Sequence, residues 1–388
     1  MRLRSILRWA ILILNIILIL TFAWLSSRPM PPLPPPSPPA ASSSEGEHLR
    51  VLVIVVEGAD RELINLATPS IVADLKAPAD LAAALSALAT GTSQEGEVEP
   101  EPFWRTAMRR GLRAAVLFWP EIYPDSALRA DYTVAPASCY GNSSLHTITF
   151  TQPLSTPESL PASFSPPVEG IVEIRGEEGG LMASLRLWAL DSSDDGTSNY
   201  DAVLLEGSQK PLHPGEWLAE EVDHHLHSGA FFKLLELSPD AKKAVLYRTP
   251  LCYTYALPPS LLQELNREIG FFRPPPDPQS LAEGWITPED ASFLEKEMAR
   301  WTTEATVLVW ERYKPDILLA HFPQASALTA ESLKPLAEGM REGEIMMFIS
   351  LAPEGFLAVY GGGEQSFATP ISLSAEDIAP LVLSLLLK

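Results

Sequence analysis

The chain has 388 residues, of which 46% are hydrophobic, so it can bury one large core or one core with an inserted subdomain. Its formal net charge of −21 repels the backbone of a nucleic acid, which argues against DNA or RNA as a partner. The two cysteines, Cys139 and Cys252, are too far apart for a CxxC redox motif or a structural zinc site. They can pair as one disulfide if the chain is exported, or they can be two buried thiols.

Residues 1–28 have the pattern of a membrane anchor. Arg2, Arg4 and Arg8 precede an apolar run over residues 9–25, which at about 1.5 Å per residue is long enough to form a short membrane span. The positive charges lie on the amino-terminal side, so the rest of the chain is expected outside the cytoplasm. We therefore predict a single-pass protein of the cell membrane with an uncleaved signal anchor; a cleaved signal peptide is the alternative.

Residues 29–47 are rich in proline and serine and predict a semi-rigid polyproline II linker. The folded part then begins near His48. Residues 49–56 (LRVLVIVV) form a nearly continuous apolar run, which is typical of a strand buried on both faces of a parallel sheet.

Further buried strands and several helices follow along the chain. The strands are predicted at residues 114–119, 316–321, 345–350 and 355–360. The helices are predicted at residues 80–89, 103–110, 291–312, 329–341 and 375–387. This alternation predicts an α/β fold with a mostly parallel sheet sandwiched by helices.

The middle of the chain differs from this pattern. Residues 151–290 are rich in proline, glycine and charged residues, and their shorter strand-like runs alternate between polar and apolar. We expect them to form an inserted, antiparallel-rich cap subdomain. The core is then divided between residues 48–150 and 291–388.

Several stretches together resemble bacterial members of the type I phosphodiesterase/nucleotide pyrophosphatase family of the alkaline phosphatase superfamily. They include VLVIVVEGADRELI (51–64), LSALATGT (85–92), ERYKPDILLAHF (311–322) and EDIAPLVLSLL (376–386). The resemblance implies an alkaline-phosphatase-like fold with two metal ions, typically zinc, at the carboxyl ends of the core strands. It also implies a threonine or serine nucleophile.

The residues at the first two site positions depart from the family pattern. Glu57 stands where the family has its first metal-binding aspartate, and its extra methylene moves the carboxylate outward by about 1.5 Å, whereas metal coordination tolerates about 0.2 Å. Leu81 stands at the position of the nucleophile, nine residues before Thr90. A leucine side chain cannot attack phosphorus or bind a metal.

The later ligand positions depart as well. Ser326 and Ala330 stand where the family has an aspartate and a histidine. The family turn Ser-Asp-His-Gly reads Ala-Pro-Glu-Gly at residues 352–355, so Glu354 replaces the histidine. Because no histidine follows His321, the last expected ligand is also missing.

Two hypotheses follow from this comparison. The first is a catalytically inactive homologue with a binding, scaffold or regulatory role, no cofactor, and an unknown protein or small molecule as its ligand. In it Glu57 is a degenerate remnant of the metal site, Glu354 is a weak candidate ligand, and no residue is catalytic. The second is an active metal-dependent phosphodiesterase or phosphatase with displaced ligands drawn from Glu57, Asp60, Glu354 and His321, and a hydroxyl such as that of Ser70. We expect the first.

Three further patterns each have a functional and a structural explanation. Residues 223–227 (DHHLH) fit a surface metal site or a polar loop, and residues 191–195 (DSSDD) fit a calcium loop or a solvated turn. Residues 361–363 (GGG) fit an anion-binding nest or an ordinary turn. We expect the structural explanation in each case.

Overall fold

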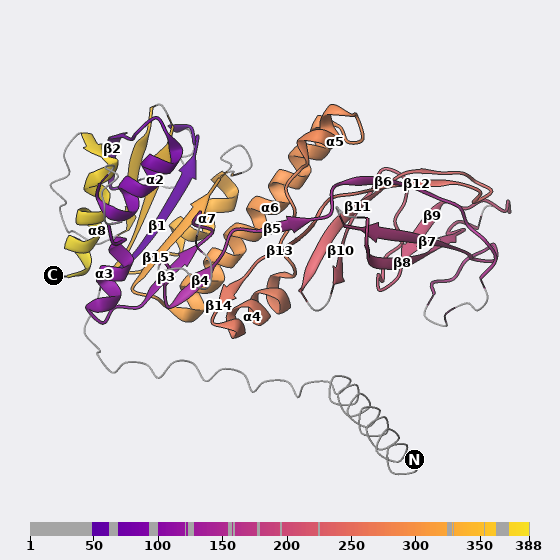
Figure 1. The fold of residues 1–388 in the computed structure, drawn as a ribbon, viewed down its shortest axis with the longest axis horizontal. Helices are drawn as coiled ribbons and strands as arrows, with labels where there is room; N and C mark the ends of the chain where they lie inside the picture. The colour runs from indigo at the N-terminus through magenta and orange to yellow at the C-terminus, as the bar shows by residue number, and fades with distance from the viewer. Residues whose placement is uncertain are drawn as a thin grey trace, which may run out of the picture. The chain divides into compact units, whose positions relative to one another are not determined.

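The fold consists of three β-sheets and the helices that pack on them (Figure 1). The computed structural model describes residues 49–387 except 62–68, 93–99, 121, 123–127, 154–156, 158–159, 177–178, 195, 224–225, 324–327, 329, 353 and 362–371. The anchor predicted for residues 1–28 and the linker predicted for residues 29–47 lie outside the described residues. Within the described part of the chain, no helix is both long and apolar enough to cross a membrane.

The largest sheet has nine strands, and its centre is built from the predicted apolar runs. In spatial order the strands are β14 (Ala256–Leu257), β4 (Tyr132–Val134), β3 (Ala114–Leu117), β15 (Ile317–Phe322), β1 (Arg50–Glu57), β16 (Glu344–Leu351), β17 (Phe356–Gly361), β2 (Ile71–Lys76) and β18 (Ser372–Ser374). Strands β4, β3, β15, β1 and β16 run parallel to one another. Strand β1 is buried from Val51 to Val56, and its side chains enter the two cores alternately.

The expected mostly parallel sheet is wrong, because the nine-stranded sheet is mixed and the other two sheets are antiparallel. Strand β17 runs antiparallel to both of its neighbours, β16 and β2, and β14 runs antiparallel to β4. Only residues 352–355 join β16 to β17, whereas a parallel crossover needs a dozen or more residues. An apolar run indicates burial on both faces but not strand direction, which is why the sequence misled here.

Helices cover both faces of the nine-stranded sheet. One face carries α2 (Leu81–Thr90), α3 (Phe103–Arg109) and α8 (Ile378–Leu386), and the other carries α4 (Pro259–Ile269), α6 (Pro288–Leu308) and α7 (Ala330–Glu338) (Figure 1). Local signals explain where α2 begins and ends. The carboxylate of Asp80 accepts a hydrogen bond from the backbone N–H of Ala83, and Gly91 ends the helix with a left-handed φ of 76°.

The other two sheets lie in the middle of the chain. The six-stranded sheet contains β5 (Ser138–Tyr140), β13 (Leu251–Tyr253), β11 (Ser228–Leu237), β12 (Ala244–Arg248), β6 (Ser144–Ile148) and β10 (Trp217–Asp223), and the three-stranded sheet contains β7 (Val168–Arg175), β8 (Leu181–Leu190) and β9 (Ala202–Leu205). They share one apolar core. A Cβ on Gly170 would lie 2.5 Å from Cγ2 of Ile148, so the glycine allows this close approach of β7 to β6.

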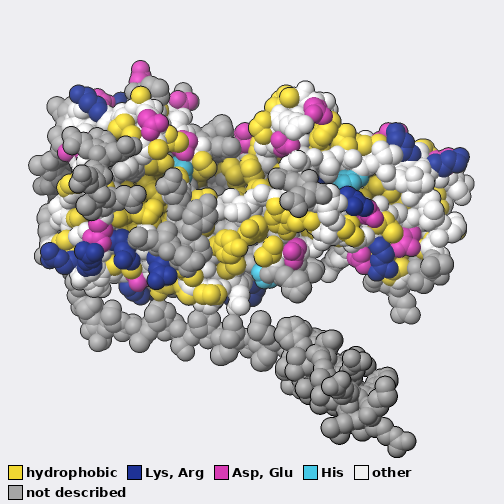
Figure 2. Space-filling view, viewed as in Figure 1, with side chains coloured by type: hydrophobic (Ala, Val, Ile, Leu, Met, Phe, Trp, Pro, Cys, Tyr) yellow, Lys and Arg dark blue, Asp and Glu magenta, His cyan; other side chains and the backbone are white. Residues whose placement is uncertain are grey.

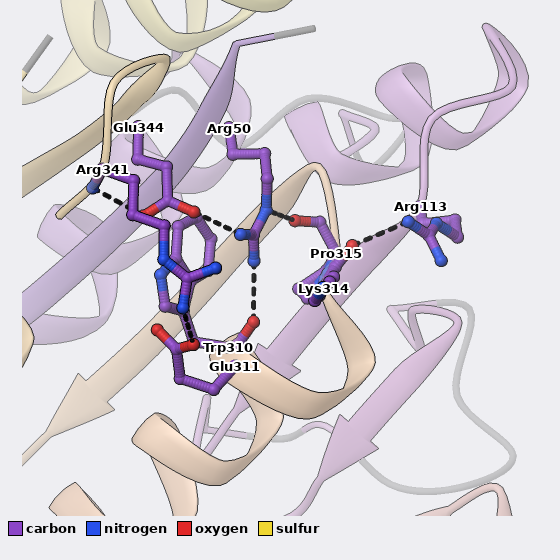
Figure 3. A network of polar contacts seen from close by, with 8 residues as sticks. All are labelled: Arg50, Arg113, Trp310, Glu311, Lys314, Pro315, Arg341 and Glu344. Atoms are coloured by element: carbon purple, nitrogen blue, oxygen red, sulfur yellow. Dashed lines mark hydrogen bonds and ion pairs between the residues drawn. The ribbon is translucent and has the colours of Figure 1, made fainter. Parts of the chain in front are cut away.

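Arg50 holds the amino ends of the parallel strands together (Figure 3). Its guanidinium donates to the carbonyl oxygens of Pro315 (3.0 Å) and Trp310 (2.7 Å) and pairs with the carboxylate of Glu344 at the start of β16. It also lies 3.8 Å over the ring of Trp310, which belongs to the π-helical turn η2 (Val309–Tyr313) at the end of α6. One side chain therefore connects β1, β16 and the segment that leads into β15.

A buried ion pair attaches the six-stranded sheet to α6. The Lys233 ammonium on β11 donates to both carboxylate oxygens of Asp290, at 2.6 and 2.7 Å, and the indole N–H of Trp217 donates to the same carboxylate at 3.0 Å. Asp290 also forms a capping box with Thr287 at the start of α6. Burial opposes ionisation of this carboxyl group, but the hydrogen bonds from Lys233, Thr287 and Trp217 outweigh it and lower the pKa of Asp290.

We expect Asp290→Asn to lower the free energy of unfolding by about 3 kcal/mol at pH 7, because it leaves Lys233 buried without its counter-charge. Urea denaturation measures the change. Glu289→Gln is the matched control, since Glu289 is an exposed acid in the same first turn of α6 and should change stability by less than about 0.5 kcal/mol. Equal effects of the two substitutions would contradict this role of the ion pair.

Candidate functional site

The carboxyl ends of the central parallel strands meet at one edge of the nine-stranded sheet. Glu57 ends β1, His321 is the next-to-last residue of β15, Trp119 follows β3, and Ser350 lies near the end of β16. The strand register places Val55 beside His321 and Val56 beside Ser350. Open α/β sheets bind their ligands at this edge, so we take it as the candidate site.

Glu57 and His321 are in contact at this edge. Nε2 of His321 lies 2.8 Å from Oε1 of Glu57, and the histidine side chain is 3% exposed whereas that of Glu57 is 25% exposed. The carboxylate oxygen lies off the direction of a ring N–H, so the contact has no hydrogen-bond geometry. The pair joins the ends of two neighbouring strands that are far apart in the sequence.

The two residues that follow β3 contact the other side of the His321 ring. Nδ1 of His321 lies 3.3 Å from the carbonyl oxygen of Phe118, and the ring packs edge to face with Trp119 at 5.9 Å between centroids. Phe118 has a φ of 59°, which a bulky residue rarely adopts, so this turn of the backbone is strained. Strain of this kind often gathers at functional sites.

The loop after β1 is tied to the end of β16. The backbone N–H of Gly58 donates to the carbonyl oxygen of Leu351 at 3.1 Å, and the hydroxyl of Ser350 donates to the carbonyl oxygen of Ala59 at 2.7 Å. Ser350 is fully buried. Its hydroxyl is therefore a structural contact and not an accessible nucleophile.

The other acids predicted for the site lie on the surface. Asp60 and Glu354 are both exposed, the first in the loop after β1 and the second in the turn between β16 and β17. Leu81 is the first residue of α2 and is 41% exposed. It offers no oxygen or nitrogen atom to a metal or a phosphoryl group.

Two more predicted positions add no metal ligand or accessible nucleophile. Ala330 is the first residue of α7, and an alanine carries no donor atom. The Ser70 hydroxyl donates to the carbonyl oxygen of Val359 at 2.9 Å beside β2, which is separated from β1 by β16 and β17. Three strand spacings amount to about 14 Å, so Ser70 is too far from Glu57 to share a metal site with it. Ser326 and Pro353 lie outside the described residues.

The donor atoms at this edge do not fit a two-zinc centre. No group of three or more His, Cys, Asp or Glu side chains within the described residues could hold a metal ion. Two donors on one tetrahedral zinc ion lie about 3.4 Å apart, because each bond is about 2.1 Å long. Oε1 of Glu57 and Nε2 of His321 are 2.8 Å apart, which is shorter than this.

The remaining predicted patterns are only partly described. His227 pairs with Glu221 at 2.9 Å, and His224 and His225 lie outside the described residues. Asp191 is fully buried and accepts a hydrogen bond from the hydroxyl of Ser165, so it does not belong to a solvated turn. Of the three consecutive glycines, Gly361 ends β17 and residues 362–363 lie outside the described part of the chain.

Sequence reasoning missed Trp119 and Ser350 as parts of this edge. The signal that could have found them is positional, since each lies at the carboxyl end of a predicted buried strand. Parallel strands bring such ends together even when the residues are neither acids nor histidines.

Comparisons with known proteins add little to this description. No family model matches the chain, and no curated protein matches it. A solved structure of the cofactor-independent phosphoglycerate mutase from Thermoplasma acidophilum DSM 1728 aligns with 87% of this chain and 99% of its own, at 10% identity and a TM-score of 0.26. That score is too low to carry an argument about fold or function.

We expect the Glu57–His321 pair to be energetically coupled. The variants Glu57→Ala, His321→Ala and their combination should give a coupling energy of about 1 kcal/mol or more in a double-mutant cycle of urea denaturation, because the two groups are in direct contact. The cycle of Asp60→Ala with His321→Ala is the control, since Asp60 is exposed in the same loop and should give additive effects. Additivity of Glu57 and His321 within about 0.3 kcal/mol would show that the contact is not formed.

Proposed function

We propose that this protein is a non-catalytic, membrane-anchored, extracytoplasmic homologue of type I phosphodiesterases and nucleotide pyrophosphatases that binds an unidentified protein or small molecule. The contact between Glu57 and His321 carries the proposal. Glu57 is the acid at the first metal position of the family, and its Oε1 lies 2.8 Å from Nε2 of a buried histidine. A carboxylate that already contacts another side chain of the protein is a poor metal ligand.

The missing nucleophile supports the same proposal. Phosphoester hydrolysis in the family requires a hydroxyl beside the metal ions, and Leu81 occupies the matching position. The hydroxyl of Ser350 at the strand ends is buried and donates a hydrogen bond to the carbonyl oxygen of Ala59.

Two observations support the extracytoplasmic location. Cys139 on β5 and Cys252 on β13 are opposite each other and form a disulfide, which is typical of chains in oxidising compartments. The arginines before the apolar run of residues 9–25 orient the chain in the same way. On the face drawn in Figure 2, Lys and Arg side chains gather at the lower left with acidic side chains among them, and acidic and basic side chains lie near one another elsewhere. The formal net charge of −21 argues against a nucleic acid as partner.

Hydrolysis and metal content test the proposal together. We expect the full-length protein in detergent to retain no stoichiometric zinc after dialysis and to leave bis(4-nitrophenyl) phosphate uncleaved when zinc, manganese or magnesium is added. Leu81→Thr should be equally inactive, because it restores the hydroxyl without the metal ligands. Stoichiometric zinc together with cleavage that Glu57→Ala abolishes would overturn the proposal.

An active hydrolase with displaced ligands is the second candidate, because Glu57 and His321 do converge at the strand ends. It requires a nucleophile and further ligands at the same edge, and neither exposed Glu354 nor distant Ser70 supplies them. In the same assay this candidate predicts metal-dependent cleavage that is lost in His321→Ala.

A further inference from the structure

Arg248 ends β12 and is a buried cation. The residue is 2% exposed, and no carboxylate within the described residues pairs with it. Its guanidinium donates to three neutral acceptors: the carbonyl oxygens of Thr249 (2.6 Å) and Asn142 (2.9 Å) and the hydroxyl of Ser144 (3.3 Å). Burial of an unpaired charge is costly, and neutral acceptors offset only part of that cost.

One donor of the guanidinium is unused. Nε of Arg248 is buried and has no hydrogen-bond partner. Arginine commonly binds oxyanions through two parallel N–H groups, so an unsatisfied Nε–H on a buried arginine is a donor suited to an anionic group.

Ser144 and His146 connect Arg248 to the surface. Ser144 is opposite Arg248 in the register of β6 and β12, and its hydroxyl also lies 2.8 Å from Nε2 of His146 on the same face of β6. Both side chains are half-buried, and β6 is the last strand on this side of the six-stranded sheet. The polar chain from Arg248 through Ser144 to His146 therefore reaches the edge of the sheet.

The charge of this group is a single positive charge at neutral pH. Burial, and then the nearby Arg248, lower the pKa of His146 to about 4, so its imidazole is neutral. Burial also lowers the pKa of Arg248 to about 10, which leaves the guanidinium charged. A ligand that neutralises this group therefore carries one negative charge.

The state of His146 can be checked by the pH dependence of stability. Because the pKa of His146 is about 4 in the folded protein and about 6.5 in the unfolded chain, the unfolded chain binds more protons between these values. The stability of the unsubstituted protein relative to His146→Gln should thus fall as the pH decreases from about 6.5 to about 4. Denaturation across this range measures it, and Thr147→Ala, an exposed neighbour on β6, should show no such trend.

We propose that Arg248, Ser144 and His146 form a binding site for the carboxylate group of a small molecule. The carboxylate supplies the negative charge that no described residue places beside the buried guanidinium, and it accepts the unused Nε–H. The site lies in the six-stranded sheet and does not depend on the function proposed for the strand ends at Glu57.

Thermal unfolding of the full-length protein in acetate tests this site. At pH 7.5, sodium acetate should raise the unfolding temperature in a saturable way above sodium chloride at equal ionic strength. Ser144→Ala and His146→Ala should each weaken the apparent acetate affinity about fivefold or more, and Arg248→Met should abolish the difference between acetate and chloride. Thr147→Ala should respond like the unsubstituted protein.

Three results would overturn the proposal. They are equal unfolding temperatures in acetate and chloride, an acetate response unchanged in both Ser144→Ala and His146→Ala, and a larger saturable response to phosphate than to acetate at equal ionic strength. If Arg248→Met does not fold, the Ser144 and His146 variants decide the question.

Discussion

Burial of strand β1 on both faces is the constraint on which the rest of the structure depends. From Val51 to Val56 the strand is enclosed by two apolar cores and hydrogen-bonded to β15 and β16. Each end is held by a charged or polar contact to one of these neighbours: Arg50 forms an ion pair with Glu344 of β16, and Glu57 contacts His321 of β15. A one-residue slip of β1 would separate both pairs and exchange the two cores, so charge and packing specify the same register.

The same constraint explains the chemistry at the strand ends. In a metal hydrolase the carboxylates at this edge must be accessible to metal ions. Here the residues at the end of β1 make contacts within the protein instead. Glu57 contacts His321, and the backbone N–H of Gly58 donates to the carbonyl oxygen of Leu351. The carbonyl oxygen of Ala59 accepts a hydrogen bond from the hydroxyl of Ser350. Groups that stabilise the sheet in this way are not available to a substrate.

The six-stranded sheet contains two buried cations that differ in their surroundings. Lys233 is paired with Asp290 and so attaches the sheet to α6. Arg248, on the neighbouring strand β12, has only neutral acceptors. The first arrangement is complete within the chain, whereas the second lacks one negative charge within the described residues. This difference separates a structural ion pair from a candidate binding site.

The sequence by itself determined where the central strands and several helices lie, because burial and capping are properties of residue type and local order. The apolar runs at residues 49–56 and 316–321 are strands. The carboxylate of Asp80 caps the start of a helix, and Gly91, which has no side chain, ends it in the left-handed conformation. The resemblance in residue types also predicted that Leu81 stands where the family has its nucleophile.

Only the tertiary structure decided how these pieces combine. It showed that β17 and β2 run antiparallel in a mixed sheet, that Cys139 pairs with Cys252, and that His321 meets Glu57. It also showed that Arg248 is buried and that no acid among the described residues pairs with it. The physical reason is that strand direction, pairing and charge balance depend on contacts between residues far apart in the chain. Such contacts follow from packing of the whole fold and leave no local pattern in the sequence.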